Sequence, residues 1–273
     1  MVDQPSPPEW EARLEWARQF AVEAGKLTLR HFQQAGLRVE EKADQSPVTA
    51  ADREAEQRLR ERIAERFPQD GVLGEEFGET QGNSGVRWIL DPIDGTKSFI
   101  CGVPLYGTMV GVEFEGRCHV GVVYLPGLDE GVFARTGEGT YWFGGNETPR
   151  RCSVSQTDRL DRASFVTSQV STFETRGAAE GYRELERRAK VTRTWGDCYG
   201  YFLVAQGRVD LMVDPIFNVW DAAAIQPILQ EAGGVLTNWR GEETIHGGEG
   251  VACNRRLLPE VLEILSRYSP AKA

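Results

Sequence analysis

The stretch "WILDPIDGTKSF" at residues 88–99 constrains the possible fold more than any other part of the chain. Its apolar start predicts a buried strand, and Asp91 and Asp94 follow where that strand is expected to end. Pro92 disfavours helical dihedral angles at Asp91 and fixes its own φ, so the turn is stiff. Both carboxylates and the carbonyl of Ile93 can therefore face one point. Two interpretations stay open here: a tight turn that favours aspartate, and a place that holds divalent cations.

Asp91 favours the cation site, because it ends an apolar run that is expected to be buried. A buried carboxylate without a partner costs on the order of several kcal/mol, and Arg87 is the only basic residue that closely precedes it. An EF-hand is the obvious alternative, but that loop needs acids at positions 1, 3 and 5, glycine at 6 and glutamate at 12. Counted from Asp91, the glycine is fifth, and Gly102 occupies the place of the glutamate.

Composition excludes several classes of function. The net charge is −10, which argues against a nucleic-acid binder because such a protein needs a basic face. The five cysteines are odd in number and form no CxxC pair, so we expect no disulfide framework or zinc knuckle and place the chain in a reducing cytoplasm. We expect no signal peptide and no membrane span. With only three histidines, any metal would be a hard cation bound by oxygen.

Hydrophobic periodicity predicts one mixed α/β domain over residues 1–273. Spacings of three and four predict helices at 8–34, 51–67, 178–189, 197–207, 220–234 and 257–267. Apolar and β-branched runs predict strands at 72–76, 86–90, 108–116, 118–126, 162–168, 208–213 and 250–254, with a hairpin turn at Glu115-Gly116. The polar stretch 39–49 reads as irregular, with Pro47 as a breaker.

Asp52 and Asp221 each permit a purely structural interpretation. Thr49 to Asp52 and Asn218 to Asp221 both have the spacing of a capping box, in which the acid bonds back to the N-cap amide. An acid in a first turn also favours the helix dipole. Taken singly, both residues favour the cap over a catalytic role.

The combination of motifs points further. "SPVTAAD" (46–52), "GEE" (74–76), "WILDPIDGT" (88–96) and "WDAAAIQPILQEAGG" (220–234) occur in this order along nearly the whole chain. Together they resemble the inositol monophosphatase superfamily of magnesium-dependent, lithium-sensitive phosphatases. The resemblance implies an α/β (α+β) fold, the layered α-β-α-β-α sandwich of the inositol monophosphatase and fructose bisphosphatase type. It also implies a homodimer.

The same resemblance implies roles for individual residues. Glu75 and Asp91, with the Ile93 carbonyl, would bind a first Mg²⁺, and Asp91, Asp94 and Asp221 a second. Asp52 and Thr96 would orient the attacking water near a third, weaker Mg²⁺, and Glu75 is counted with them as catalytic. Lys42 would lie near that outer metal and the phosphate. From the residues themselves, we expect the amides of Gly95 and Thr96 to form a phosphate cradle at a helix start.

The substrate is predicted from two further segments. "WGDCYGY" (195–201) and "DP" (214–215) resemble the histidinol-phosphatase branch of the superfamily, which acts in histidine biosynthesis. Asp197 and Asp214 would add acceptors for a cationic substrate, although Asp197 also has the position of a helix N-cap. The partner is thus expected to be a small phosphorylated metabolite, not nucleic acid or membrane. A broad inositol or sugar monophosphatase, a phosphatase of 3′-phosphoadenosine phosphate, and a non-catalytic cation-binding module stay open.

Overall fold

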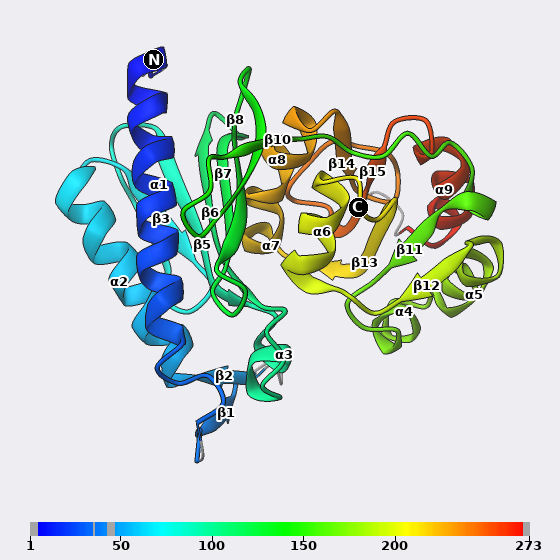
Figure 1. Cartoon of the computed structure of the whole chain (residues 1–273), viewed down its shortest axis with the longest axis horizontal. Coiled ribbons are helices and arrows are strands. Elements are labelled where there is room, and N and C mark those ends of the chain that lie inside the picture. Colours follow the sequence, from blue (N-terminus) through cyan, green and yellow to red (C-terminus); the bar gives the residue numbers. More distant parts are fainter. Residues whose placement is uncertain (1–4, 35, 43–46, 270–273) are drawn as a thin grey trace.

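Helical and extended segments alternate along the chain and stack as helix, sheet, helix, sheet, helix (Figure 1). The computed structural model describes residues 5–34, 36–42 and 47–269. The first layer consists of α1 (Pro7–Thr28) and α2 (Ala50–Arg66). They pack on an eight-stranded sheet with the order β10-β9-β8-β7-β6-β5-β3-β4. Its strands are β3 (Gly71–Gly74), β4 (Gly78–Thr80), β5 (Val86–Asp94), β6 (Gly107–Phe114), β7 (Arg117–Leu125), β8 (Glu130–Arg135), β9 (Gly139–Gly144) and β10 (Arg150–Cys152).

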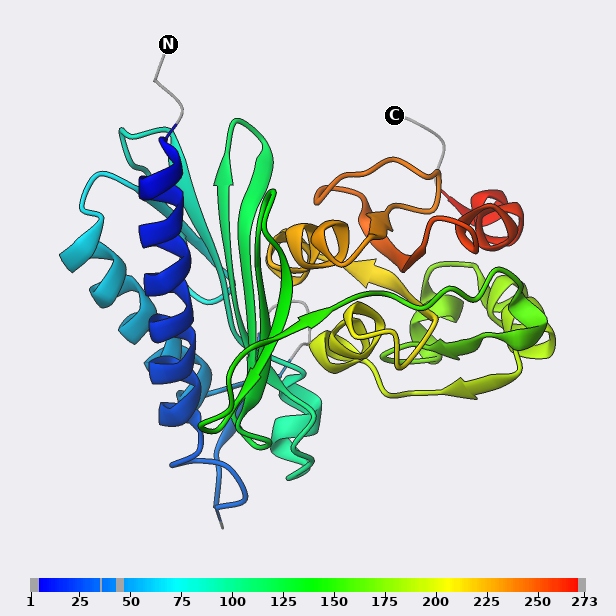
Figure 2. The ribbon, with the colours of Figure 1, turned by 45° about the horizontal axis from the view of Figure 1, so that its top comes forward.

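The middle helical layer lies between two sheets, as both views show (Figures 1 and 2). It contains α6 (Asp197–Ala205), α7 (Val219–Ala223) and α8 (Ile225–Glu231). The second sheet has the order β12-β11-β13-β15-β14, and α4 (Ser171–Thr175), α5 (Ala179–Arg188) and α9 (Leu258–Leu265) cover its outer face. Its strands are β11 (Ser164–Val166), β12 (Val191–Arg193), β13 (Leu211–Phe217), β14 (Gly234–Thr237) and β15 (Gly248–Asn254).

The strand alternation of β5 decides which side chains face which layer. Trp88 and Leu90 belong to the apolar cluster under α1 and α2, whereas Ile89 belongs to the cluster around the middle helices. Because successive side chains of a strand point to opposite faces, Asp91 faces the same side as Ile89. The carboxylate at the end of this buried strand therefore points toward the layer that contains α7.

A pair of glycines brings the middle helices close to the large sheet. Gly111 on β6 is the cross-strand partner of Gly121 on β7. A Cβ at Gly111 would lie 2.7 Å from the Ala223 side chain, and one at Gly121 would lie 2.0 Å from the Ala224 carbonyl oxygen. The junction of α7 and α8 thus packs where this pair of strands has no side chains.

Several predicted boundaries are wrong for identifiable reasons. The helix predicted at 220–234 is interrupted at Ala224, because Pro227 cannot donate a hydrogen bond to the carbonyl four residues before it. The strand predicted to end at Leu90 runs to Asp94, with an irregular register between Asp91 and Asp94. The first helix ends at Thr28, not at 34.

Other expectations concern the connections between elements. Pro47 pairs with Glu41 in a small two-stranded sheet, β1 (Val39–Glu41) and β2 (Pro47–Thr49), whereas 43–46 lie outside the described residues. The hairpin turn is confirmed, with φ of 50° at Glu115 and 78° at Gly116. All five cysteines are free. Among the described helices, none is long and apolar enough to cross a membrane.

Candidate active site

Strand register brings Glu75 next to Asp91. The strands β3 and β5 are parallel, with Gly74 opposite Leu90, so the residues that follow each of them are neighbours. The Glu75 amide donates to the Leu90 carbonyl at 3.2 Å, which extends this pairing by one residue. Two acids that are distant in sequence thus meet at one end of the large sheet.

The "DPID" segment is a bulged strand end. Asp91 pairs with Met109 and Asp94 with Gly107, and the register shifts between these two pairs. Pro92 contributes no amide donor, and its carbonyl accepts a hydrogen bond from Thr108 Oγ1 at 2.8 Å. The stiffness that the sequence predicts therefore appears as a fixed irregularity in β5, which re-aims Asp94.

Three aspartates form the centre of the site. Asp91, Asp94 and Asp221 each offer one carboxylate oxygen, and these oxygens lie within 4.8 Å of one another. Asp91 is only 1% exposed, and its Oδ1 has no hydrogen-bond partner among the described residues. Such an orphaned buried carboxylate oxygen is expected where a cation completes the site. Arg87 does not supply it, because this side chain pairs with Glu79 and Glu113 instead.

Burial and the neighbouring negative charges raise the pKa values of these three acids. Burial, followed by the charges of Glu75 and Asp94, raises the pKa of Asp91 well above its usual value. Burial, followed by the charge of Asp197, does the same for Asp94. Burial raises the pKa of Asp221 to about 7, and the charge of Glu75 adds to this effect. The cluster holds more negative charge than its protein surroundings neutralise.

Asp52 and Asp221 are helix caps and site residues at once. Each closes a capping box, with Asp52 Oδ2 accepting the Thr49 amide at 2.8 Å and Asp221 Oδ2 accepting the Asn218 amide at 2.7 Å. The other Asp52 oxygen, Oδ1, lies 3.4 Å from Thr96 Oγ1. The two interpretations of these acids are thus compatible, because a carboxylate has two oxygens.

Gly95 and Thr96 directly follow Asp94 in the chain. The Thr96 hydroxyl also donates to the Ile93 carbonyl at 3.0 Å, so the predicted carbonyl ligand and the predicted water-orienting hydroxyl are adjacent. Gly95 precedes the short helix α3 (Thr96–Ile100) with φ of 86°, in the left-handed region that favours glycine. A Cβ at Gly95 would lie 3.1 Å from Asp197 Oδ2. The absence of a side chain at Gly95 is what lets Asp197 approach.

Lys42 lies at the edge of the acidic cluster. Its Nζ lies 2.7 Å from Glu75 Oε1 and 2.6 Å from Glu76 Oε1. The pKa of Lys42 is raised overall. Burial alone would lower it, but the hydrogen bonds to Glu75 and Glu76 outweigh that effect. Burial nevertheless raises the pKa of Glu76 to about 7, since one lysine does not neutralise both glutamates.

A cavity of about 90 Å³ adjoins the aspartate cluster, with Asp94, Met109, Ser168, Asp197, Cys198, Tyr201, Asp214, Ile216, Phe217 and Asp221 in its wall. Asp197 begins α6 with φ of 53°, a left-handed conformation that is uncommon for residues with a side chain. The N-cap of this helix is Gly196, and no side chain caps it. The N-cap interpretation of Asp197 is therefore wrong.

The Asp214 carboxylate is engaged by groups of the protein. Its carboxylate accepts the Ser168 amide and the Ser168 hydroxyl, each at 3.0 Å, and the Tyr201 hydroxyl at 3.0 Å. Burial raises the pKa of Asp214 to about 6, against the effect of the Ser168 amide. Asp214 lies in the cavity wall, where its hydrogen bonds hold Ser168 and Tyr201.

Sequence reasoning missed Ser168 and the amide of Cys198. The Ser168 hydroxyl accepts the Asp197 amide at 2.8 Å, and the Cys198 amide donates to Asp94 Oδ2. Both contacts join segments that are far apart in the chain, so no local sequence pattern predicts them. The sequence gives only an indirect signal, in that Ser168 is the last residue of the strand predicted at 162–168.

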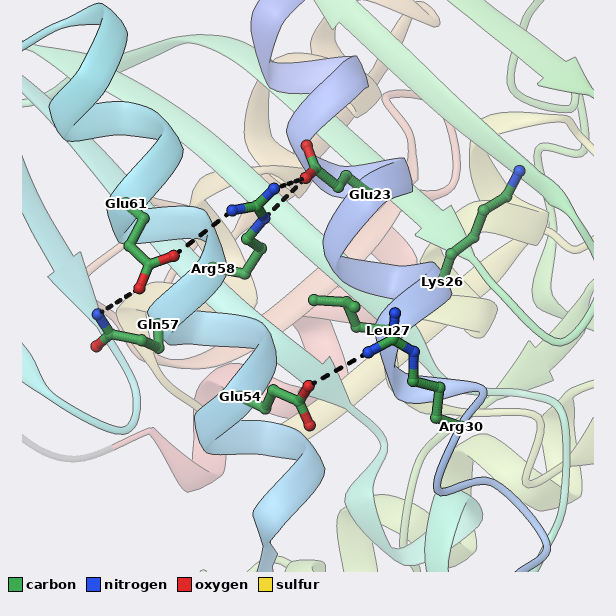
Figure 3. Close-up of a pocket in the computed structure, with 8 residues that line it drawn as sticks. All are labelled: Glu23, Lys26, Leu27, Arg30, Glu54, Gln57, Arg58 and Glu61. Atoms are coloured by element: carbon green, nitrogen blue, oxygen red, sulfur yellow. Dashed lines mark hydrogen bonds and ion pairs between the residues drawn. The ribbon is translucent and has the colours of Figure 1, made fainter.

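A larger hollow of about 620 Å³ lies between α1 and α2, and the acids of the cluster do not line it (Figure 3). Its charges largely cancel: Arg58 pairs with Glu23 and Glu61, and Arg30 pairs with Glu54 at 3.7 Å. This hollow carries no surplus charge that would bind a ligand.

Comparison with known proteins gives a consistent picture. A model of the inositol monophosphatase family matches residues 9–269. A histidinol-phosphatase from Chlorobaculum parvum is 43% identical over 238 residues, which is 87% of this chain and 90% of that protein. One from Mycobacterium tuberculosis is 40% identical over 246 residues, 90% of this chain and 95% of its own. The extragenic suppressor protein suhB from Bartonella henselae has the same layered fold, with a TM-score of 0.86 at 29% identity over 94% of this chain and 99% of its own.

Proposed function

The chain belongs to the inositol monophosphatase family of phosphatases, and on that premise we propose that it hydrolyses L-histidinol phosphate with the help of Mg²⁺. The family is metal-dependent, and the donor set of this site suits a hard cation, because its acids and the Ile93 carbonyl offer only oxygen. The Oδ1 of Asp91, which has no hydrogen-bond partner in the described part of the chain, supports the assignment. Asp91, Asp94, Asp221, Glu75 and the Ile93 carbonyl would hold two ions, and a third would lie nearer Asp52.

When bound, Mg²⁺ neutralises the phosphate dianion, lowers the pKa of a bound water and stabilises the leaving alkoxide. The chain's own residues place that water. Thr96 has a single hydroxyl hydrogen, with which it donates a hydrogen bond to the Ile93 carbonyl, so its Oγ1 is left to accept a hydrogen bond from the water. Asp52 Oδ1, 3.4 Å from Thr96 Oγ1, would accept the second hydrogen bond of the water and, as general base, the one proton that the water loses on attack. A lone pair of the water oxygen is then free to attack the phosphorus.

The phosphate itself would be held by three groups at the edge of the cluster. The amides of Gly95 and Thr96 lie next to the metal ligand Asp94 in the chain. Lys42 is within reach of Glu75 and Glu76 and adds a positive charge beside them. We assign these groups to the phosphate oxygens, which are strong hydrogen-bond acceptors.

One observation carries the choice of substrate: Asp197 adds negative charge to the cavity beyond what the metals would use. Its carboxylate lies close to Gly95, and burial raises its pKa against the effects of a hydrogen bond with Ser168 and of the charge of Lys97. Histidinol phosphate carries an amine and an imidazole, whereas inositol offers only hydroxyls. A hydrogen bond from an ammonium to this carboxylate contributes about 1.5–3 kcal/mol and joins two opposite charges, whereas a hydroxyl of a neutral polyol brings no charge of its own. Asp214, with its oxygens engaged, would act mainly by shaping the cavity.

The test is phosphate release with Mg²⁺ from four substrates: histidinol phosphate, inositol-1-phosphate, fructose-1,6-bisphosphate and 3′-phosphoadenosine phosphate. We expect kcat/KM for histidinol phosphate to exceed the others by at least about tenfold, the ratio that about 1.4 kcal/mol gives. Equal values for histidinol phosphate and inositol-1-phosphate would instead assign the chain to the broad monophosphatases.

A further inference from the structure

Glu56 is a buried carboxylate one helical turn after Asp52, on the same face of α2. Its side chain is 0% exposed. Its Oε2 accepts the Glu76 amide at 2.7 Å, and its Oε1 accepts the Phe77 amide at 3.2 Å and Arg60 Nε at 2.8 Å. None of the roles assigned above uses this residue.

These contacts fix the turn that carries Glu75. The turn has three residues, Glu75 to Phe77, because Gly74 of β3 pairs with Gly78 of β4. The Glu75 amide donates to Leu90, and the other two amides donate to Glu56. Every backbone donor of the turn is therefore bound, two of them by the same Glu56 side chain.

The fit around this carboxylate is close. A Cβ at Gly74 would lie 2.0 Å from Glu56 Oε1, so the carboxylate occupies the space that a side chain would take. Arg60 supplies the opposite charge and also donates to the Gly78 carbonyl and to Thr80 Oγ1. Burying this acid is thus compensated by a partner that binds the same turn.

We propose that Glu56 is a positioning residue for the metal centre: its carboxylate fixes the turn of residues 75–77 and so holds Glu75 beside Asp91. The proposal rests on the proposed function, because it takes Glu75 as a metal ligand. Groups that orient a ligand typically change metal affinity by about 10–100-fold when they are removed.

The Glu56→Gln variant tests the proposal. A glutamine has one acceptor oxygen, so its NH₂ group must face at least one of the three donors that now bind the carboxylate. We expect the tightest Mn²⁺ site, followed by electron paramagnetic resonance, to weaken about 10–100-fold. The kcat at saturating Mg²⁺ should change less than the Mg²⁺ concentration needed for half-maximal activity.

Two further variants separate positioning from stability. Gly74→Ala displaces the Glu56 carboxylate without altering it and should weaken the same Mn²⁺ site, which decides the matter even where Glu56→Gln does not fold. Asp70→Asn is the matched control, since Asp70 is a buried acid paired with Arg13 that immediately precedes β3, at its other end. We expect Asp70→Asn to lower the melting temperature and to leave Mn²⁺ affinity unchanged.

The proposal is overturned if folded Glu56→Gln and Gly74→Ala bind Mn²⁺ as the unaltered protein does, or if Asp70→Asn loses as much affinity. Failure of the metal assignment, on which the proposal rests, looks different, because the unaltered protein would then bind no Mn²⁺ at all. A different best substrate would leave the metal site and the proposal unaffected.

Discussion

Asp197 is the residue on which the substrate assignment depends. Its left-handed backbone suits asparagine as well as aspartate, so Asp197→Asn removes the charge without straining the start of α6. We expect kcat/KM for histidinol phosphate to fall about ten- to a hundredfold and that for inositol-1-phosphate to stay within a few-fold, because only the former loses a charge-assisted contact. Asp94→Asn serves as the comparison and should reduce both alike. Equal losses of kcat/KM for the two substrates with Asp197→Asn would show that this carboxylate does not recognise the leaving group.

Asp91 is the residue on which the metal assignment depends. Asp91→Asn removes one charge of a crowded, buried cluster, so we expect turnover with Mg²⁺ to fall by orders of magnitude. In EDTA the melting temperature should rise, by about 2–4 °C for each kcal/mol of relieved repulsion. Thermal unfolding and phosphate release on the same preparation check both effects. Near-normal turnover at saturating Mg²⁺ would show that Asp91 is not a ligand.

At the scale of elements, the approach of α7 and α8 to the sheet positions Asp221. The Gly121→Ala variant adds a methyl group 2.0 Å from the Ala224 carbonyl oxygen, which must push this helix junction away from β7. We expect a loss of about 1–3 kcal/mol of unfolding free energy together with weaker activation by Mg²⁺. Gly131→Ala on β8 is the control, because its methyl group would crowd Val123 and Phe143 instead. If both variants affect Mg²⁺ activation equally, the junction does not set the position of Asp221.

Some features of the elements can be predicted from the sequence, and others cannot. The predicted layered fold is confirmed, and the predicted acids meet, because the motif around Asp91 is specific and its strand has a clear apolar pattern. Periodicity did not reveal the break at Ala224, since the residues on both sides continue a helical pattern and only close packing on Gly121 shows its purpose. The contact of Asp214 with Ser168 was equally hidden, because it depends on which strands are neighbours in the second sheet.

At the scale of the molecule, the site collects charge from three layers: α2, the large sheet and the middle helices. Burial raises the pKa of Asp221 to about 7, against about 4 for an unfolded aspartate. An acid whose pKa is raised by folding stabilises the fold below its unfolded pKa and loses that contribution as pH rises through its folded pKa. The metal-free protein should therefore lose stability between about pH 4 and 7 through this group.

Mg²⁺ should reverse this trend, because it binds the ionised carboxylates. We expect the increase in melting temperature that Mg²⁺ causes, relative to EDTA, to grow from pH 6 to pH 8. The difference in melting temperature between Mg²⁺ and EDTA cancels the contributions of groups outside the site. One such group is His119, whose pKa is lowered by burial. An increase that is the same at both pH values would mean that the acids of the cluster do not bind the ion.

The most direct test of the whole account is the metal dependence of phosphate release from histidinol phosphate. We expect release to require Mg²⁺, to stop with EDTA, and to fall when Li⁺ or Ca²⁺ is added to the Mg²⁺ enzyme. Ca²⁺ is larger and takes more ligands at longer distances, so it would occupy the site and misplace the water. Release that continues at the same rate in EDTA would contradict the metal centre formed by Glu75, Asp91, Asp94 and Asp221.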